Sequence, residues 1–501
     1  MPEHLRALGV IFVLALITFR VVRPMAIELL PEDTFRRWRN LWLLMTVLLF
    51  LAHSYWVYGL VVAMYALVVL RREAQIVGLY FLLLFVAPPA RVEVPGFGLV
   101  NYIFALNQYR LLALVVLLPV AISLTQRGST LRLGRSPVDW MVLGYLVLLS
   151  VLQFRDANLT SGLRNLVTNV VDIFLPYYVV SRSLRDLNDF RHALTGFVLG
   201  AMVLAVLAAF EVLRTWKLYF PLLGALGLNP REFGGYLFRG SLLRPDVSVG
   251  GSIVLGYVVM VALGYFLYLR HSITSRFQLR LGFLLLAGGV LASLSRGPWV
   301  GALFMFVVFL ATGPGAMRKL FRLSMAGVVV AVLLNFVPGG RAFLDLLPFV
   351  GTVDEFNVEY RANLLTAAMP VIERNLWLGS VDFLKAPELQ VMIQGDGIID
   401  IVNSYIGVTL EMGLAGLFFF VGMFVQALRR VRQAYRRAVV LGEESQLLGR
   451  ALFAVLGGIA LVIYTVSGVT AVPIVYWTAV AIGVAYAAYV DRALAAHRPE
   501  P

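Results

Sequence analysis

The sequence predicts an all-α fold, a polytopic transmembrane helical bundle of about 12–15 spans with a large outward-facing helical loop. Composition is the first observation behind this prediction, because 60% of the 501 residues are hydrophobic and only 14% are charged. An ordinary soluble chain is about 45–50% apolar and about 25% charged. So few charges could not cover this much apolar surface in water, whereas a bilayer needs no such cover. The second observation is that the apolar residues gather in runs close to the roughly 17–25 residues that cross a bilayer.

The predicted spans follow one another along the whole chain. They lie near residues 5–22, 75–90, 107–125, 138–154, 163–181, 193–213, 251–269, 281–294, 299–312, 321–338, 403–427, 449–468 and 471–490. The run 41–70 has two interpretations, one long tilted helix or a tight hairpin that turns near Ala52, His53 and Ser54. We expect no cleavable signal peptide, because the first apolar run lacks a small-residue cleavage site.

Basic residues predict the orientation of the bundle. The net charge is +14, but Lys and Arg sit in short clusters between apolar runs, which indicates membrane topology and not a nucleic-acid-binding surface. The most basic connection holds Arg429, Arg430, Arg432, Arg436 and Arg437. Placing the basic connections in the cytoplasm leaves the others outside, at residues 91–106, 155–162, 214–250, 295–298 and 339–402.

This orientation divides the chain into four parts. They are N-terminal helices at 1–190, central helices at 191–338 with the outer loop 214–250, the large outer loop 339–402, and C-terminal helices with a cytoplasmic tail at 403–501. The outer loop 339–402 holds nine acidic and four basic residues. Apolar residues recur at helical spacing from Arg361 to Leu376, which predicts a helix that Pro370 should bend or interrupt. We therefore expect an ordered cap over the outer membrane face.

The first candidate site is the turn Ser-Arg-Gly-Pro-Trp at 295–299, which joins two apolar spans with almost no connecting residues. Arg296 is its only charge. It could be an interfacial anchor, with the guanidinium reaching the headgroups and Trp299 in the aromatic belt. It could equally bind an anion, because the planar fork of Arg donates two hydrogen bonds to a phosphate. Cysteine is absent, which excludes disulfides, zinc-thiolate sites and thiol nucleophiles.

Further candidates lie in the large outer loop, at the outer entry of another span, and within a span. Arg361 could be a surface partner of Glu355 or Glu359, or a second anion-binding group. Arg244, in the run Arg-Pro-Asp, stands before another span. Arg164 and Asp172 lie eight positions apart in one span. They could equally form a structural ion pair or belong to a functional site.

The junction 400–405 leads into the span at 403. Asn403 can be a helix cap, and Tyr405 follows it in the first turn. Glu411 lies inside the span, where a carboxylate is costly and by default functional.

In order along the chain, these segments resemble the O-antigen ligase and Wzy-type polysaccharide polymerase family of bacterial membrane glycosyltransferases. Three pieces carry the resemblance: Ser-Arg-Gly at 295–297, Arg361 ahead of Asn-Leu-Trp-Leu-Gly at 375–379, and Asn-Ser-Tyr at 403–405 followed by Glu411-x-Gly-Leu-x-Gly-Leu. Arg244-Pro-Asp before a Gly-containing span is also similar to the family. The resemblance covers roughly residues 190–430.

The resemblance implies a GT-C-like enzyme that works without a metal or other cofactor, inverts the sugar configuration, and faces the periplasm from the bacterial inner membrane. Its donor would be a glycan on undecaprenyl diphosphate and its acceptor a second glycan, with the lipid bilayer and a chain-length regulator as further partners. Arg296 and Arg361 would hold the diphosphate, because charge that develops on a leaving group needs fixed positive groups. The residues implied to bind substrate are Arg244, Asn403, Tyr405 and Glu411.

One position departs from the family pattern. Family members commonly carry His immediately before the Asn-Ser-Tyr segment, where it is thought to activate the acceptor hydroxyl, but this chain has Val402 there. Of its five His, only His53 could reach the outer face, and only if 41–70 is a hairpin. Asp400 is the nearest carboxylate and is the predicted base. A reaction driven by leaving-group stabilisation without a strong base is the alternative.

The predicted function is polymerisation of undecaprenyl-diphosphate-linked oligosaccharide into exopolysaccharide or O-antigen. The alternative within the class is an O-antigen ligase that moves the glycan to lipid A-core. A lipid or polysaccharide transporter or flippase is the alternative from another class, although the inverted repeats typical of transporters are not evident. A non-catalytic scaffold stays open because of Val402.

Overall fold

Helices make up nearly all of the regular structure in the computed structural model, which describes residues 1–69, 73–96, 101–126, 131–155, 158–228, 235–336, 355–394 and 397–496. The N-terminal helices are α1 (Glu3–Leu29), α2 (Glu32–Leu51), α3 (Tyr55–Val69), α4 (Ile76–Leu83), α5 (Gln108–Leu112), η2 (Ala113–Leu117), α6 (Leu118–Gln126), α7 (Pro137–Leu152), α8 (Leu159–Asn169), η3 (Val170–Phe174) and α9 (Leu175–Ser183). The segments η2 and η3 are π-helical turns within otherwise continuous helices.

The C-terminal part is equally helical. Its helices are α10 (Leu187–Arg214), α11 (Phe220–Ala225), α12 (Ser252–Leu269), η5 (Arg270–Ser272), α13 (Arg276–Ala292), α14 (Arg296–Ala311), α15 (Ala316–Leu334), α17 (Glu355–Arg374), η6 (Phe383–Lys385), α18 (Pro387–Gln390), α19 (Ser404–Arg437), η7 (Ala438–Leu441), α20 (Glu443–Val462) and α21 (Ala471–Ala496). Two antiparallel hairpins complete the described structure, β1 (Val92–Pro95) with β2 (Tyr102–Leu106) and β3 (Phe238–Arg239) with β4 (Leu242–Leu243).

The predicted all-α membrane bundle is confirmed. In the described part of the chain, seven helices are long and apolar enough to cross a membrane: Glu3–Leu29, Gln108–Gln126, Leu187–Arg214, Ser252–Ser272, Ser404–Leu441, Glu443–Val462 and Ala471–Ala496. Three shorter apolar helices accompany them at Tyr55–Ala66, Pro137–Leu152 and Arg296–Ala311. The helix α12 is apolar all round and 94% buried in its span, so it forms the centre of the bundle.

The run 41–70 is a hairpin. The helices α2 and α3 meet at residues 52–54, where His53 has a backbone φ of 50° in the left-handed region. A continuous helix could not contain that conformation. Trp216 donates a hydrogen bond of 3.0 Å to Glu3, so the start of α1 lies against the outer loop 214–250.

The predicted span 75–90 is shorter than expected. The helix α4 ends at Leu83, and residues 84–87 continue as buried irregular turns before Pro88 and Pro89. Proline has no amide hydrogen to continue a helix, and it also disfavours helical backbone at the preceding residue. The eight residues of α4 cannot cross a bilayer, and they pack inside the protein against α10.

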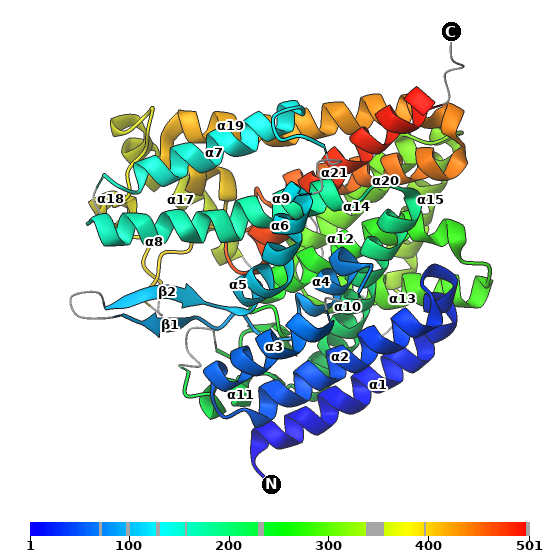
Figure 1. Cartoon of the computed structure of the whole chain (residues 1–501), viewed down its shortest axis with the longest axis horizontal. Helices are drawn as coiled ribbons and strands as arrows, with labels where there is room; N and C mark the ends of the chain where they lie inside the picture. The colour runs from blue at the N-terminus through cyan, green and yellow to red at the C-terminus, as the bar shows by residue number, and fades with distance from the viewer. Residues whose placement is uncertain are drawn as a thin grey trace.

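Two of the connections predicted to face outward, 91–106 and the described part of 339–402, lie toward one end of the bundle. In Figure 1, β1, β2 and α18 lie at the left end, whereas α21 runs toward the opposite, upper right. The long helix α19 begins near the former end with Ser404 and finishes in the basic run that closes at Arg437. The hairpin β1–β2 and the helix α18 therefore lie toward one end of the bundle, and the basic run that closes α19 lies toward the other.

The helix predicted from Arg361 to Leu376 is present as α17 and begins six residues earlier, at Glu355. Pro370 lies inside α17 and does not end it. The apolar face of α17 packs with α18 and the start of α19 in a small cluster of its own, formed by Leu364, Ala368, Val371, Leu389, Met392 and Leu410. This cluster gives the described part of the outer loop an ordered core. Residues 339–354 of that loop lie outside the described residues.

Candidate functional site

The Ser-Arg-Gly turn lies inside the protein. Between α13 and α14, Ser293, Leu294 and Ser295 are all buried. Leu294 has a φ of 49°, which reverses the chain in very few residues. Trp299 is 7% exposed and donates a 2.7 Å hydrogen bond to the carbonyl of Val290, so it braces the turn and does not sit in an aromatic belt. The guanidinium of Arg296 is thus carried by the first residue of α14 on a rigid, protein-enclosed turn.

Arg361 and the Ser-Arg-Gly turn contact the same residue, Thr465. Arg361 donates a 3.4 Å hydrogen bond to the Thr465 carbonyl. A Cβ added at Gly297 would lie 2.5 Å from the Thr465 hydroxyl oxygen, so only glycine allows the turn to approach this closely. Thr465 belongs to the connection 463–470 between α20 and α21. This connection brings together two segments that lie 64 positions apart, Gly297 and Arg361.

The connection 463–470 also contacts Asp400. Ser467 donates a short hydrogen bond to a carboxylate oxygen of Asp400, and Tyr360 donates one of 3.1 Å to the Asp400 carbonyl. Ser404 donates to the carbonyl of Val466 at 2.7 Å. The hydroxyl of Ser467 therefore fixes the position of the Asp400 carboxylate. Ser467 is two residues along the chain from Thr465, whose carbonyl accepts from Arg361.

A further arginine reaches the Ser-Arg-Gly turn from the outer loop 214–250. Arg239, on β3, is 7% exposed and donates to the carbonyl of Leu294. Arg244 follows β4, and its amide donates a 2.9 Å hydrogen bond to the carbonyl of Leu237. The hairpin β3–β4 thus lies on the turn, which Arg239 contacts directly.

A buried carboxylate organises this outer loop. Glu211, near the end of α10, is fully buried and accepts hydrogen bonds from the amides of Leu218, Asp246 and Val247 at 2.8–3.1 Å. Lys217 forms an ion pair with Asp246. Burial raises the pKa of the Asp246 carboxyl, and the charges of Lys217 and Arg244 oppose that shift. These contacts fix both ends of the loop that carries Arg239 and Arg244.

Two of the predicted substrate-binding residues make structural contacts. Asn403 is the N-cap of α19, and its side-chain oxygen accepts from the amides of Tyr405 and Ile406 at 2.9 and 3.2 Å. The Tyr405 hydroxyl donates a 2.7 Å hydrogen bond to the carbonyl of Ala460 in α20. Both residues therefore hold the start of α19 in place beside the connection 463–470.

Glu411 lies at a break in α19. Gln153 donates to its carboxylate at 3.4 Å. Gly413, two residues on, has φ 64° and ψ −163°, so the helix is interrupted there. The loop after α17 fills the break, because the amides of Leu414 and Ala415 donate to the carbonyls of Leu376 and Trp377 at 2.8 and 3.1 Å. The segments Asn-Leu-Trp-Leu-Gly at 375–379 and Glu-x-Gly-Leu at 411–414 are thus hydrogen-bonded to each other at this break, here called the Gly413 joint.

Replacing Gly413 by Ala should destabilise the protein strongly. Its backbone conformation is essentially restricted to glycine and costs another residue about 1–3 kcal/mol. An added Cβ would also lie 2.3 Å from the carbonyl carbon of Trp377. We expect a clear fall in the thermal unfolding temperature of the detergent-purified protein.

The matched control for this change is Gly407→Ala in the same helix. Its added Cβ would meet its nearest neighbour, Ile401, at 3.6 Å, so we expect a neutral effect or a gain of up to about 1 kcal/mol. If the two variants unfolded at the same temperature, the structural requirement for glycine at position 413 would be refuted.

The contacts decide one other sequence-based alternative and locate His53. Asp172 pairs with Arg110 through hydrogen bonds of 2.8–3.1 Å, so the suggested pair of Arg164 with Asp172 is wrong. Arg164 instead donates to the carbonyl of Tyr102 and stacks on its ring at 3.6 Å. His53 lies beside His4, with ring centroids 6.2 Å apart, near the start of α1.

Sequence reasoning overlooked Thr465, Ser467 and Glu211. Thr465 and Ser467 belong to the run Thr-Val-Ser-Gly-Val-Thr at 465–470, whose hydroxyls were a visible signal between two apolar spans. Glu211 stood inside the predicted span 193–213, where a carboxylate is unusual. The functional groups that these residues bring together are guanidiniums and carboxylates. Within the described ranges, no group of three or more His, Cys, Asp or Glu could hold a metal ion.

Comparison with known proteins gives one family. Residues 281–421 match a family model described as O-antigen ligase. The matched segment contains Arg296, Arg361, Asp400 and the Gly413 joint, and it confirms the resemblance to the O-antigen ligase and Wzy-type family. It supports an O-antigen ligase or Wzy-type glycan-processing membrane enzyme. No curated protein matches the chain.

Proposed function

We propose that this protein is a membrane glycosyltransferase that polymerises undecaprenyl-diphosphate-linked oligosaccharide units into exopolysaccharide or O-antigen, because residues 281–421 match the O-antigen ligase family model. The observation that carries the proposal is the meeting of Gly297, Arg361 and Asp400 on the connection 463–470. Two arginine-bearing segments and one carboxylate, from distant parts of the chain, all contact the connection 463–470. That combination suits transfer of a glycan from a diphosphate.

The reaction would be a single displacement. An acceptor hydroxyl attacks the anomeric carbon of the donor glycan, and the bond from that carbon to the diphosphate oxygen breaks with its electron pair on the oxygen. Arg296 and Arg361 would stabilise the charge that develops there, since Arg keeps its proton throughout. Asp400 would accept the hydroxyl proton. Attack opposite the leaving group inverts the configuration, and no metal is needed for any of these roles.

The family description favours a second candidate, an O-antigen ligase that transfers the glycan to lipid A-core. A purified system separates the two functions. Incubation with undecaprenyl-diphosphate-linked oligosaccharide alone should give a ladder of longer lipid-linked glycans if the protein is a polymerase. A product that forms only when lipid A-core is added would identify a ligase. Movement of the donor across a vesicle membrane with no new glycosidic bond would contradict both.

We further propose that the protein spans the bacterial inner membrane with the site at the periplasmic face. The absence of cysteine allows a direct test with single cysteines at Val391 and Gln433, both of which are exposed. Val391→Cys should react with a membrane-impermeant thiol reagent added to intact cells with a permeable outer membrane. Gln433→Cys should react only after the inner membrane is opened. The reverse pattern would overturn the orientation and move the proposed site to the cytoplasm.

A further inference from the structure

A second charged site lies at the other end of the bundle, near the ends of α9, α19 and α21. It is a cavity of about 430 Å³, here called the basic cup. Its basic lining residues are Arg135, Arg182, Arg185, Arg430 and Arg492. Among the described residues that line it, Asp491 is the only acidic one. The glycosyl-transfer chemistry proposed above uses none of these residues.

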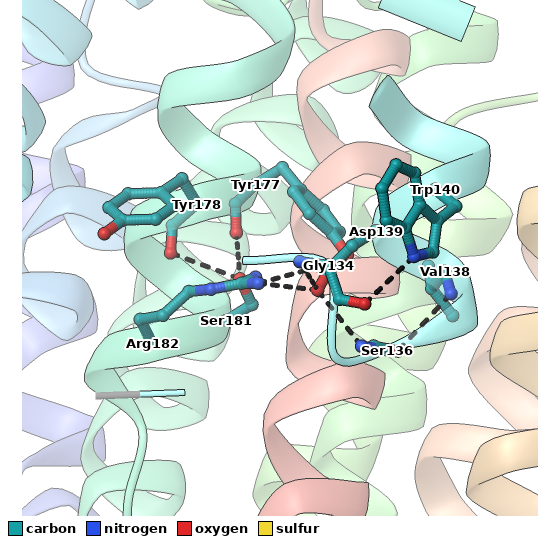
Figure 2. A network of polar contacts seen from close by, with 9 residues as sticks. All are labelled: Gly134, Ser136, Val138, Asp139, Trp140, Tyr177, Tyr178, Ser181 and Arg182. Atoms are coloured by element: carbon teal, nitrogen blue, oxygen red, sulfur yellow. Dashed lines mark hydrogen bonds and ion pairs between the residues drawn. The ribbon is translucent and has the colours of Figure 1, made fainter. Parts of the chain in front are cut away.

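The floor of the basic cup is a buried ion pair. Arg182 and Asp139 are both completely buried and are joined by two hydrogen bonds of 2.8 Å. Figure 2 shows the Arg182 guanidinium pointing at Asp139, with Tyr177 and Ser181 beside it. Tyr177 donates to the same carboxylate at 2.6 Å. Because Asp139 neutralises Arg182, this pair gives the cup rigidity and not excess charge.

The same carboxylate positions Arg135. The amides on either side of it, those of Gly134 and Ser136, donate to one oxygen of Asp139 at 3.0 and 3.2 Å. Arg135 is therefore presented at the rim by a fixed loop. Another lining residue, Arg492, donates a 3.2 Å hydrogen bond to the carbonyl of Arg185. The guanidinium of Arg492 is thus held by a neutral carbonyl, which leaves its charge available.

The described residues neutralise the charge of the rim only in part. Asp491 pairs with Arg430 at 3.2 Å and also with Arg437, so its one charge is shared by two arginines. In the described part of the chain, no ion pair engages Arg135, Arg185 or Arg492. The remaining lining residues are Ser136 and Ser181 and an apolar wall formed by Leu131, Leu184, Val484, Ala487, Ala488 and Ala495.

We propose that the basic cup binds a phosphate-bearing anion, and that this anion is the headgroup of a phospholipid in the adjacent leaflet. Arg is suited to phosphate because its planar fork donates two hydrogen bonds to neighbouring oxygens. Basic pockets between membrane helices are sites for anionic lipid headgroups, and the apolar wall suits the start of the acyl chains. A soluble phosphate would satisfy the arginines but would leave that wall uncovered.

The test uses the full-length protein in nanodiscs of phosphatidylcholine with increasing phosphatidylglycerol, and native mass spectrometry to count the retained phosphatidylglycerol. The cup variant Arg135→Gln, Arg185→Gln, Arg492→Gln should need about tenfold or more phosphatidylglycerol for the same occupancy. The matched control is Arg429→Gln, Arg432→Gln, Arg436→Gln, which removes the same charge from exposed or solvent-facing positions on α19 outside the cup. It should change occupancy by less than about threefold.

Equal losses in the two triple variants would overturn the proposal, because they would indicate a general attraction to the basic end. Displacement of phosphatidylglycerol by millimolar inorganic phosphate would overturn the lipid assignment. If the cup variant does not fold, Arg135→Gln and Arg492→Gln are tested singly. Each should weaken retention by at least about threefold, and wild-type retention in both would refute the site.

Discussion

Replacing either Arg296 or Arg361 by Ala is expected to lower the rate of glycosyl transfer by about 10²–10³-fold, the usual cost of removing one group that stabilises transition-state charge. Arg296 is carried by a turn packed on Thr465, and Arg361 donates to the Thr465 carbonyl, so both can act on one diphosphate. Lys at either position should restore activity only in part, because a point charge replaces a planar fork. Initial rates with a lipid-linked donor measure this directly.

The double variant separates one shared site from two independent ones. If both guanidiniums stabilise the same leaving group, removing the second should cost much less than removing it from the intact enzyme. Arg374→Ala is the control, because Arg374 lies in the same helix as Arg361 but pairs with Glu388 at the surface at 2.7 Å. It should change the rate less than about fivefold. Two results would refute the shared diphosphate site. One is a double variant whose loss of rate equals the product of the two single losses. The other is an experimental structure in which the two guanidiniums lie more than about 15 Å apart.

The fold was largely predictable, because a bilayer requires long apolar runs and basic connections on one side. Two elements were not predictable in detail. The run 41–70 carries no charge at its turn, so hydropathy could not choose between a helix and a hairpin, and the left-handed backbone of His53 is visible only in the structure. The apolar run 75–90 could be read as a span, although Pro88 and Pro89 end it early inside the protein.

The candidate site was predictable only in part, because a single sequence shows which residues are unusual but not which of them meet. Arg296 stood out as the charge in a short turn between apolar runs, Arg361 as a family-like charge in the outer loop, and Asp400 as the carboxylate nearest to Val402. Thr465 did not, since its role depends on a backbone carbonyl and on contact with Gly297. Conversely, Asn403 and Tyr405 belonged to a family-like segment, but their contacts are those of a helix cap and an interhelical hydrogen bond.

Replacing Asp400 by Asn is expected to lower the rate of transfer by about 10²–10⁴-fold, the range that general-base catalysis contributes. Val402 cannot accept a proton at the position where the family commonly has His. Asp400 is the carboxylate held on the connection 463–470, where Ser467 donates to it. Asn keeps an oxygen that can accept from Ser467 but cannot take the acceptor proton, so the fold should survive while the reaction slows.

Glu411→Gln is the companion variant, because it also removes one carboxylate from the same region. Glu411 accepts a hydrogen bond from Gln153 at the joint of α19, so its replacement should affect the unfolding temperature more than the rate. Ser467→Ala should reduce the turnover rate modestly, by about tenfold or less, because the carboxylate loses its orienting donor but keeps its charge. If Asp400→Asn retains a near-native rate while Glu411→Gln does not, the base has been assigned to the wrong carboxylate. If both retain it, stabilisation of the diphosphate by Arg296 and Arg361 drives the transfer without a carboxylate base.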